Sequence, residues 1–321
     1  MKRRYIAILS LVVVILGLTT TDLVAQQDAQ YTQYMYNTLS INPAYAGSRG
    51  GISILGLHRS QWVGLDGAPR TQTVSLHSPI GESKKVGLGL NIVNDEIFIS
   101  NETYIDVDFS YTISTGNNTG KLAFGLKGGV HLLDINYSEA SPFQNGDNLA
   151  TAQPNIDNKF SPQVGVGLFY HTDNYYLGLS APNLLNTEHF DEGDNSNTGN
   201  STFLAEERVN FYLTSGYVFN ITEDFKFKPA GLLKAVVGAP LQVDVTANAL
   251  LFEKLTLGVA YRWSAALSGL AGFQLTNSLM VGFAYDRETT ELQEFNDGSY
   301  EVFLRLEIFK NPKQLISPRF F

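Results

Sequence analysis

Residues 102–113 read ETYIDVDFSYTI, and this stretch decides the fold. Two sets of side chains alternate along it, one mostly apolar (Thr103, Ile105, Val107, Phe109, Tyr111, Ile113) and one mostly polar (Tyr104, Asp106, Asp108, Ser110, Thr112). A period of two places the two sets on opposite faces of a β-strand. The stretch therefore predicts a strand with one apolar face and one polar face.

The same alternation recurs along most of the chain, near residues 122–132, 164–170, 209–213, 241–245, 255–261, 279–285 and 302–308. Helical periodicity is nearly absent. The sequence therefore predicts an all-β protein. Further features decide whether the protein lies in water or in a membrane.

Three features favour a bilayer over water. About fourteen strands are expected, and many are near the length that spans hydrocarbon. The non-apolar face carries charges, as a wet lumen allows, at Asp106, Asp108, Lys127, Asp244, Arg262, Arg305 and Glu307. Aromatic residues such as Trp62, Tyr175, Tyr176, Trp263 and Tyr285 lie near strand ends, where interfacial girdles belong. We predict a transmembrane antiparallel up-and-down β-barrel.

The lengths of the connections predict the orientation. Strands are expected near 51–62, 71–78, 85–95, 102–114, 121–134, 163–171, 174–182, 208–220, 225–237, 240–251, 254–263, 266–276, 279–287 and 300–309. The three longest connections, 135–162, 183–207 and 288–299, all follow odd-numbered strands, and the connections after even-numbered strands are tight. Long loops of outer-membrane barrels face outside. We therefore expect both barrel termini in the periplasm of a cell with an outer membrane.

The first 25 residues are predicted to be a secretory signal peptide. Lys2, Arg3 and Arg4 precede an apolar run to Leu18, and Ala25 suits the residue before cleavage. An uncleaved anchor is the alternative. The processed chain carries 19 basic and 30 acidic residues, a net charge of −11 that argues against nucleic-acid binding. The absence of cysteine excludes disulfides and thiolate sites.

Two segments flank the predicted barrel of residues 51–309. Residues 26–50 are interpreted as an N-terminal periplasmic or plug segment, in which Asp28 caps a short helix with a stripe of Tyr31, Tyr34, Met35 and Leu39. A flexible leader is the alternative. Residues 310–321 are interpreted as a periplasmic C-terminal tail, because Pro312 and Pro318 do not continue a paired strand.

Several of these segments resemble the PorP/SprF family. The resemblance rests on YTQYM at 31–35, INPAYAGS at 41–48, HRSQW at 58–62, GAPRT at 67–71, LHSP at 76–79 and the terminal SPRFF at 317–321. Members are outer-membrane barrels of Bacteroidetes associated with the type IX secretion system, and some support gliding motility. The resemblance implies a non-enzymatic role in the secretion or surface attachment of large proteins, with secretion components and a surface-protein cargo as partners.

Some residues are candidates for catalysis or metal binding. His58 and Ser60 lie at i and i+2 on a strand, so they share a face, and Ser75 and His77 repeat the spacing. No orienting third group can be assigned, so ordinary wall residues are favoured over a hydrolase. The acidic loop at 191–197 lacks the regular ligand pattern of a calcium site. The five histidines lack metal-ligand spacing. We predict no enzyme activity, no cofactor and no metal.

Partner binding is predicted for the flanking segments. Residues 26–50 are rich in aromatic side chains, which give a large contact area with a polar tip. The predicted contact residues are Tyr31, Tyr34, Met35, Tyr36, Tyr45, Arg319, Phe320 and Phe321. Together they are hypothesised to form a periplasmic platform that seals the mouth or docks secretion components, with a role in barrel assembly alone as the alternative. A general diffusion porin remains a competing function, and a barrel hydrolase a third.

Overall fold

The computed structural model describes residues 29–116, 120–139, 155–185, 187–188, 206–207 and 209–309. Within these residues the chain is nearly all β, as predicted. Fourteen strands form one antiparallel sheet: β1 (Ile52–Ser60), β2 (Arg70–Ile80), β3 (Val86–Ile97), β4 (Ser100–Thr115), β5 (Gly120–Ile135), β6 (Ile156–His171), β7 (Tyr175–Ala181), β10 (Asn210–Tyr217), β12 (Phe225–Val236), β13 (Gln242–Leu251), β14 (Leu255–Arg262), β15 (Ala266–Gln274), β16 (Leu279–Glu288) and β17 (Ser299–Ile308).

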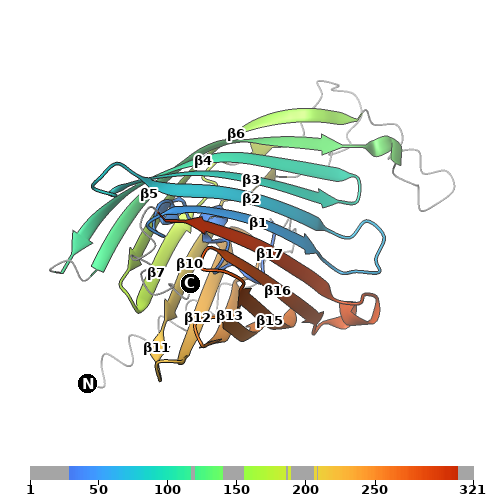
Figure 1. Ribbon diagram of the computed structural model, residues 1–321. Helices are drawn as coiled ribbons and strands as arrows, with labels where there is room; N and C mark the ends of the chain where they lie inside the picture. Colours follow the sequence, from blue (N-terminus) through green and yellow to red (C-terminus); the bar gives the residue numbers. More distant parts are fainter. Residues whose placement is uncertain are drawn as a thin grey trace, which may run out of the picture.

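The sheet closes on itself (Figure 1). Each strand pairs with its neighbours along the chain, and β1 pairs with β17, with Arg59 opposite Glu301. The ring is complete between β7 and β10, and between β10 and β12. A two-residue strand, β11 (Phe219–Asn220), also pairs with β12. The predicted up-and-down barrel of about fourteen strands is confirmed.

The two faces of the wall are those that the alternation predicts. Val107 is 56% exposed on the outside, whereas Asp108 is fully buried on the inside. Ile105 and Phe109 share the outer face with Val107, and Asp106 shares the inner face with Asp108. The outside is apolar and the inside carries the charges, an arrangement suited to hydrocarbon around the wall and polar contacts within it.

The two ends of the barrel differ in their connections. We name as the long-loop end the end at which β1, β3, β5, β7, β12, β14 and β16 end, which lies on the right of Figure 1. The opposite end, at which β2, β4, β6, β10, β13 and β15 end, is named the short-turn end. Residue 51 enters β1 and residue 309 leaves β17 at the short-turn end. The predicted segregation of long and short connections is confirmed.

Most strand boundaries lie within two residues of the sequence-based expectation, and two strands differ from it in other ways. β6 begins at Ile156 instead of residue 163, because a polar stretch with a left-handed Asn158 (φ 48°) and Pro162 still pairs with β5 beyond an irregularity between Leu133 and Ile135. The expected strand at 208–220 is divided into β10 and β11. The long connection between β7 and β10 contains a small hairpin of β8 (Thr187–Glu188) and β9 (Glu206–Glu207).

Helical structure in the described chain is limited to four short pieces. They are α2 (Thr38–Ile41) and the 3₁₀ helices η1 (Pro43–Tyr45), η2 (Tyr137–Glu139) and η3 (Glu291–Glu294). None of the described helices is long and apolar enough to cross a membrane. The predicted helix with its stripe from Tyr31 to Leu39 is reduced to α2, because Thr32 and Gln33 use their backbone N–H groups on wall residues instead. Asp28 and residues 1–25 and 310–321 lie outside the described residues.

Candidate functional site

Residues 29–50, here named the lumen segment, lie inside the barrel and form its core (Figure 1). Tyr31, Tyr34, Met35, Tyr36 and Tyr45 are each at most 9% exposed. They pack against inward-facing residues of the wall in two apolar clusters. Protein, rather than an open channel, therefore occupies the middle of the lumen.

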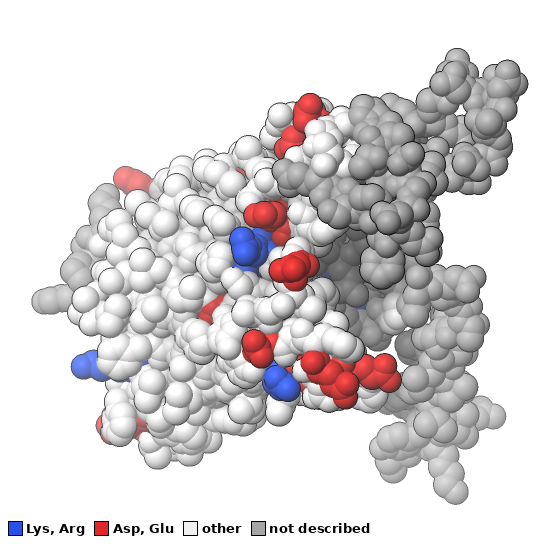
Figure 2. Space-filling model, turned by 90° about the vertical axis from the view of Figure 1, so that its right-hand side faces the viewer, with Lys and Arg blue, Asp and Glu red and all other residues white. Residues whose placement is uncertain are grey.

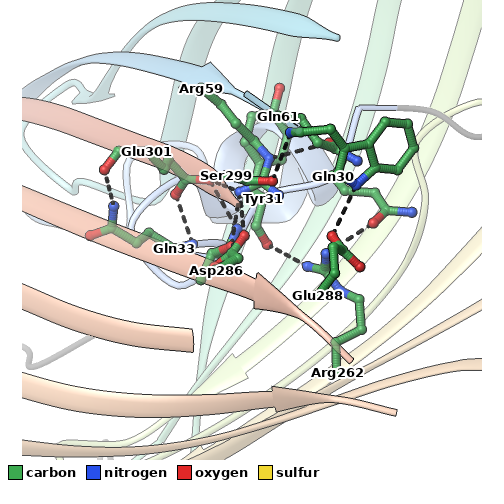
Figure 3. Close-up of polar contacts among 12 residues, drawn as sticks. Gln30, Tyr31, Gln33, Arg59, Gln61, Arg262, Asp286, Glu288, Ser299 and Glu301 are labelled. Carbon is green, nitrogen blue, oxygen red and sulfur yellow. Dashed lines mark hydrogen bonds and ion pairs between the residues drawn. The ribbon is translucent and has the colours of Figure 1, made fainter. Parts of the chain in front are cut away.

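Three charged wall residues hold the beginning of the lumen segment (Figure 3). We name them the Arg59 cluster: Arg59 from β1, Asp286 from β16 and Glu301 from β17. Nη1 of Arg59 lies 2.8 Å from Oδ2 of Asp286 and 3.3 Å from Oε2 of Glu301. All three side chains are at most 2% exposed, so each carboxylate depends on the guanidinium for its charge balance.

The lumen segment completes the Arg59 cluster. The backbone N–H groups of Thr32 and Gln33 donate to the two carboxylate oxygens of Glu301 at 2.9 and 2.8 Å. The hydroxyl of Thr32 donates to Oδ2 of Asp286 at 2.6 Å. Buried charges need such partners, so the cluster and the segment stabilise each other.

A second buried ion pair holds Gln30 and Tyr31, the residues just before Thr32. Nε of Arg262 lies 3.0 Å from Oδ1 of Asp244. The same guanidinium donates to the side-chain oxygen of Gln30 at 2.9 Å and to the carbonyl of Tyr31 at 3.3 Å. The hydroxyls of Tyr31 and Thr73 lie 2.9 Å apart on another part of the wall. Arg262 ends β14 and Asp244 lies near the start of β13, so these contacts are at the long-loop end.

The middle of the lumen segment contacts several strands. Lys127 on β5 lies 2.9 Å from Asp106 and donates to the carbonyl of Ser40 at 3.4 Å. The hydroxyl of Ser180 on β7 donates to the carbonyl of Ile41 at 2.6 Å. The ring of Tyr36 packs on Phe303 with centroids 4.6 Å apart. The lumen segment is therefore attached to strands all around the barrel wall and not to one side of it.

Glycines of the wall make room for the closest approach of the segment. A Cβ added at Gly125 would lie 2.1 Å from the backbone nitrogen of Ala44, and one at Gly87 would lie 2.1 Å from the carbonyl oxygen of Ala46. Backbone atoms of the segment leave no space for a side chain at these positions. The packing of the lumen segment therefore requires glycine at these two wall positions.

The end of the lumen segment is held at the short-turn end. The N–H of Gly47 donates to Nδ1 of His77 at 3.0 Å. Arg49 forms a buried ion pair with Glu307, close to the end of β17. Nζ of Lys84, in the turn between β2 and β3, donates to the carbonyl of Gly50 at 3.3 Å.

The residues predicted to bind a partner are thus placed as follows. Tyr31, Tyr34, Met35, Tyr36 and Tyr45 all belong to the lumen segment and face the wall. Arg319, Phe320 and Phe321 lie outside the described residues. Partner binding by these eight residues stays a prediction. In this conformation, a partner of the five buried residues would first have to displace the lumen segment.

The hydrolase candidate is brought together in part. Nε2 of His58 lies 3.1 Å from Oγ of Ser60 on the outer wall, where His58 is exposed. Gln72 is opposite His58 on β2, and no described carboxylate is hydrogen-bonded to either side chain. The repeated pair faces inward, where His77 accepts from Gly47, so that pair has a structural role.

No metal site is formed by the described residues: none of their His, Asp and Glu side chains gather in threes around a common point. The acidic loop at 191–197, which was weighed as a calcium site, lies outside the described residues.

Two connections form an ordered rim at the long-loop end. The N–H of Val63 donates to the carbonyl of Gly298 at 2.9 Å, and the N–H of Asp297 donates to the carbonyl of Val63 at 2.7 Å. Nε1 of Trp62 donates to Oε1 of Glu288 at 2.9 Å. Figure 2 looks onto this end and shows more acidic than basic side chains around it; the exposed acids of this rim are Asp66, Glu291, Glu294 and Asp297.

The Arg59 cluster and the Arg262 pair were not predicted as a site. The alternation placed Arg262 and Asp244 among the lumen charges, but nothing in the sequence paired them with Gln30 or Tyr31. Arg59 was noted only as part of HRSQW at 58–62. The available signal was the presence of charges at inward positions of several strands.

Comparisons with known proteins place the chain in a family. A family model described as "Type IX secretion system membrane protein PorP/SprF" matches residues 23–306. No curated protein matches the chain. Among solved structures, the Acinetobacter baumannii outer membrane protein Omp33 is 8% identical, with 80% of this chain and 98% of that chain covered and a TM-score of 0.47. The Ralstonia pickettii toluene transporter TbuX is 11% identical, with 83% and 91% covered and a TM-score of 0.46.

Proposed function

Since the chain belongs to the PorP/SprF family of type IX secretion system membrane proteins, we propose that it is a plugged, non-enzymatic outer-membrane barrel that assists secretion or surface attachment of large cargo proteins. Gliding adhesins are one class of such cargo. The partners are components of the secretion system and the cargo, besides the lipid of the outer membrane.

The observation that carries this proposal is the buried lumen segment. A general diffusion porin needs a continuous aqueous path, whereas the lumen here holds buried tyrosines and ion pairs that bond to the segment. Such a barrel serves better as a fixed platform in the membrane than as a pore. Because a closed barrel offers no free sheet edge, partners contact its mouths, loops and flanking segments.

The proposed orientation places the long-loop end outside the cell and the short-turn end in the periplasm. Long extracellular loops and short periplasmic turns are the usual arrangement of bacterial barrels. The ordered rim of residues 61–69 and 289–298 then faces the cargo. The end of β17, and the tail that follows it, faces the periplasmic components.

The proposal is tested by two measurements on the full chain. Affinity purification from the native outer membrane is expected to recover type IX secretion components, and deletion of the gene is expected to abolish surface display of a cargo without changing other barrels. In planar bilayers, the purified full chain is expected to show no steady conductance. A steady ohmic pore together with unchanged cargo display would favour the porin instead.

One observation favours a second candidate, a lipid hydrolase, namely the 3.1 Å contact of His58 with Ser60 on the outer wall. If that pair were a nucleophile and its base, purified protein would release fatty acid from phospholipid vesicles, and Ser60→Ala would abolish the release. Equal and negligible release by both proteins, with cargo display retained by Ser60→Ala, would exclude this function.

A further inference from the structure

We infer that the lumen segment runs through the barrel from one mouth to the other, so that its beginning at Ala29 and Gln30 lies at the long-loop mouth, at the opposite end from the point where β17 ends. Ala29 and Gln30 then belong to the surface of the long-loop mouth. Their position at this mouth follows from the contacts alone. The assignment of this mouth to the cell exterior, and hence to a cargo partner, rests on the proposed function.

The first step is the order of contacts along the lumen segment. Residue 51 enters β1 at the short-turn end, where Gly50 contacts Lys84 and Arg49 contacts Glu307. Going back along the chain, Ala46 and Ala44 pack on Gly87 and Gly125, still in the short-turn halves of β3 and β5. The contacts therefore move away from the short-turn end as the residue number falls.

The second step continues this order to the other mouth. Ser40 contacts Lys127 in the middle of β5. Gln33 and Thr32 bond to Glu301, the third residue of β17. Gln30 bonds to Arg262, the last residue of β14, at the long-loop end. The progression has no reversal among these contacts, so the chain runs from one mouth to the other.

The third step is a check of length on a single strand. Arg49 pairs with Glu307 of β17, and Gln33 bonds to Glu301 of the same strand. Six strand residues correspond to roughly 20 Å, because each adds about 3.3 Å. The 16 residues from Gln33 to Arg49 cover this distance with turns and two short helices, so the path needs no stretched chain.

This path decides how the plug can move. The segment is joined to β1 at the short-turn end, and its free end points to the long-loop mouth. It can therefore leave the lumen only by sliding its N-terminus inward and out through the short-turn end. A partner at the short-turn end can pull the plug, whereas a partner at the long-loop end can only hold its tip.

The placement also separates the two flanking segments. The hypothesised platform joined residues 26–50 with the C-terminal tail on one side of the membrane. Ala29 and Gln30 lie instead with Arg262 at the long-loop end, whereas Phe309 follows β17 at the short-turn end. Ala29 and Gln30 are thus available to cargo beside the rim, and the end of β17 is available to components on the other side.

The experiment uses single-cysteine variants, because the chain has no cysteine of its own. Ala29→Cys reports the N-terminal end, Gln293→Cys in the exposed rim reports the long-loop end, and Glu82→Cys in an exposed turn reports the short-turn end. Each is treated with a membrane-impermeant maleimide on intact cells and on permeabilised cells, and the shift of the band on unheated gels confirms folding.

We expect Ala29→Cys to behave as Gln293→Cys does, with a labelling ratio near one between intact and permeabilised cells, while Glu82→Cys loses its labelling on intact cells. Labelling of Ala29→Cys only together with Glu82→Cys would overturn the threaded path. If Gln293→Cys and Glu82→Cys exchange their behaviour, the proposed orientation fails, while agreement of Ala29→Cys with Gln293→Cys still supports the path.

A second measurement covers the case in which packing shields the thiol at position 29. An eight-residue epitope is inserted directly before Ala29, and antibody binding is compared on intact and permeabilised cells. Binding equal to that of the same epitope inserted after Gln293 supports the inference. Binding that follows an epitope inserted after Glu82 overturns it.

Discussion

Replacing Arg59 by methionine is expected to unlock the plug while leaving the barrel wall in place. Methionine retains much of the apolar stem of arginine but removes the only cation within 3.3 Å of both Asp286 and Glu301 among the described residues. It also removes the donor that lies 2.9 Å from the hydroxyl of Thr32. The two carboxylates then stay buried without their guanidinium as long as the lumen segment covers them.

The size of the effect follows from that burial. Removing one partner of a buried ion pair costs about 3–5 kcal/mol, because an uncompensated charge is left behind. The cost falls on the plugged state, since water that enters after the segment withdraws can hydrate the carboxylates. A change of 3–5 kcal/mol shifts the equilibrium between plugged and open states by roughly a hundredfold to several thousandfold.

Single-channel recording in planar bilayers measures this shift directly. The wild-type chain is expected to be silent or nearly so, Arg59→Met is expected to show openings whose probability rises by that factor, and deletion of residues 29–46 gives the fully open reference. Arg70→Met is the matched control, because Arg70 is exposed near the same mouth. If Arg59→Met is as silent as Arg70→Met while the deletion variant conducts, the Arg59 cluster does not hold the plug.

Two further changes test the wall. Val107→Lys puts a charge on the lipid face and is expected to cost ~2–4 kcal/mol at mid-membrane. The folded band on unheated gels should therefore fall far more than for Asp106→Asn, which leaves Asp108 beside Lys127. Equal losses would contradict the assigned faces. Gly125→Ala forces a methyl group onto the backbone of Ala44 and is expected to displace the lumen segment at a cost of about 1–3 kcal/mol, seen as new conductance. Gly128→Ala, with open space around it, should remain silent. Conductance in both variants, or in neither, would refute the packing argument.

The wall was predictable from sequence because each strand reports its own two faces. The alternation at residues 102–113 alone assigns Val107 to the outside and Asp108 to the inside, and the structure agrees. The start of β6 was missed because Asn158 and Pro162 interrupt the pattern, although pairing with β5 still forms. The alternation of a strand thus predicts its extent well, except where hydrogen bonds to a neighbouring strand extend it beyond the alternating residues.

The lumen segment was predictable in composition but not in place. Its tyrosines indicated a packed surface. The wall partners of the segment are nevertheless distant in sequence: Thr32 bonds to Glu301, and Gln30 bonds to Arg262. No periodicity links such a segment, with only two short helices, to residues more than 200 positions away. The direction of the chain through the lumen follows only from these long-range contacts.

The seam between β1 and β17 carries a consequence for biogenesis. Arg59 and Glu301 are paired across that seam, and the same two side chains bond to Thr32. β17 is the last barrel strand to be synthesised, so the ring is completed only after the lumen segment exists. Had the ring closed first, the lumen segment would have to enter the closed barrel through the short-turn mouth and pass the buried ion pairs of the wall. A lumen segment that is in place beforehand avoids that barrier, and the N–H groups of Thr32 and Gln33 can bond to Glu301 when the final strand pairs with β1. The lumen segment then acts as a template around which the barrel closes.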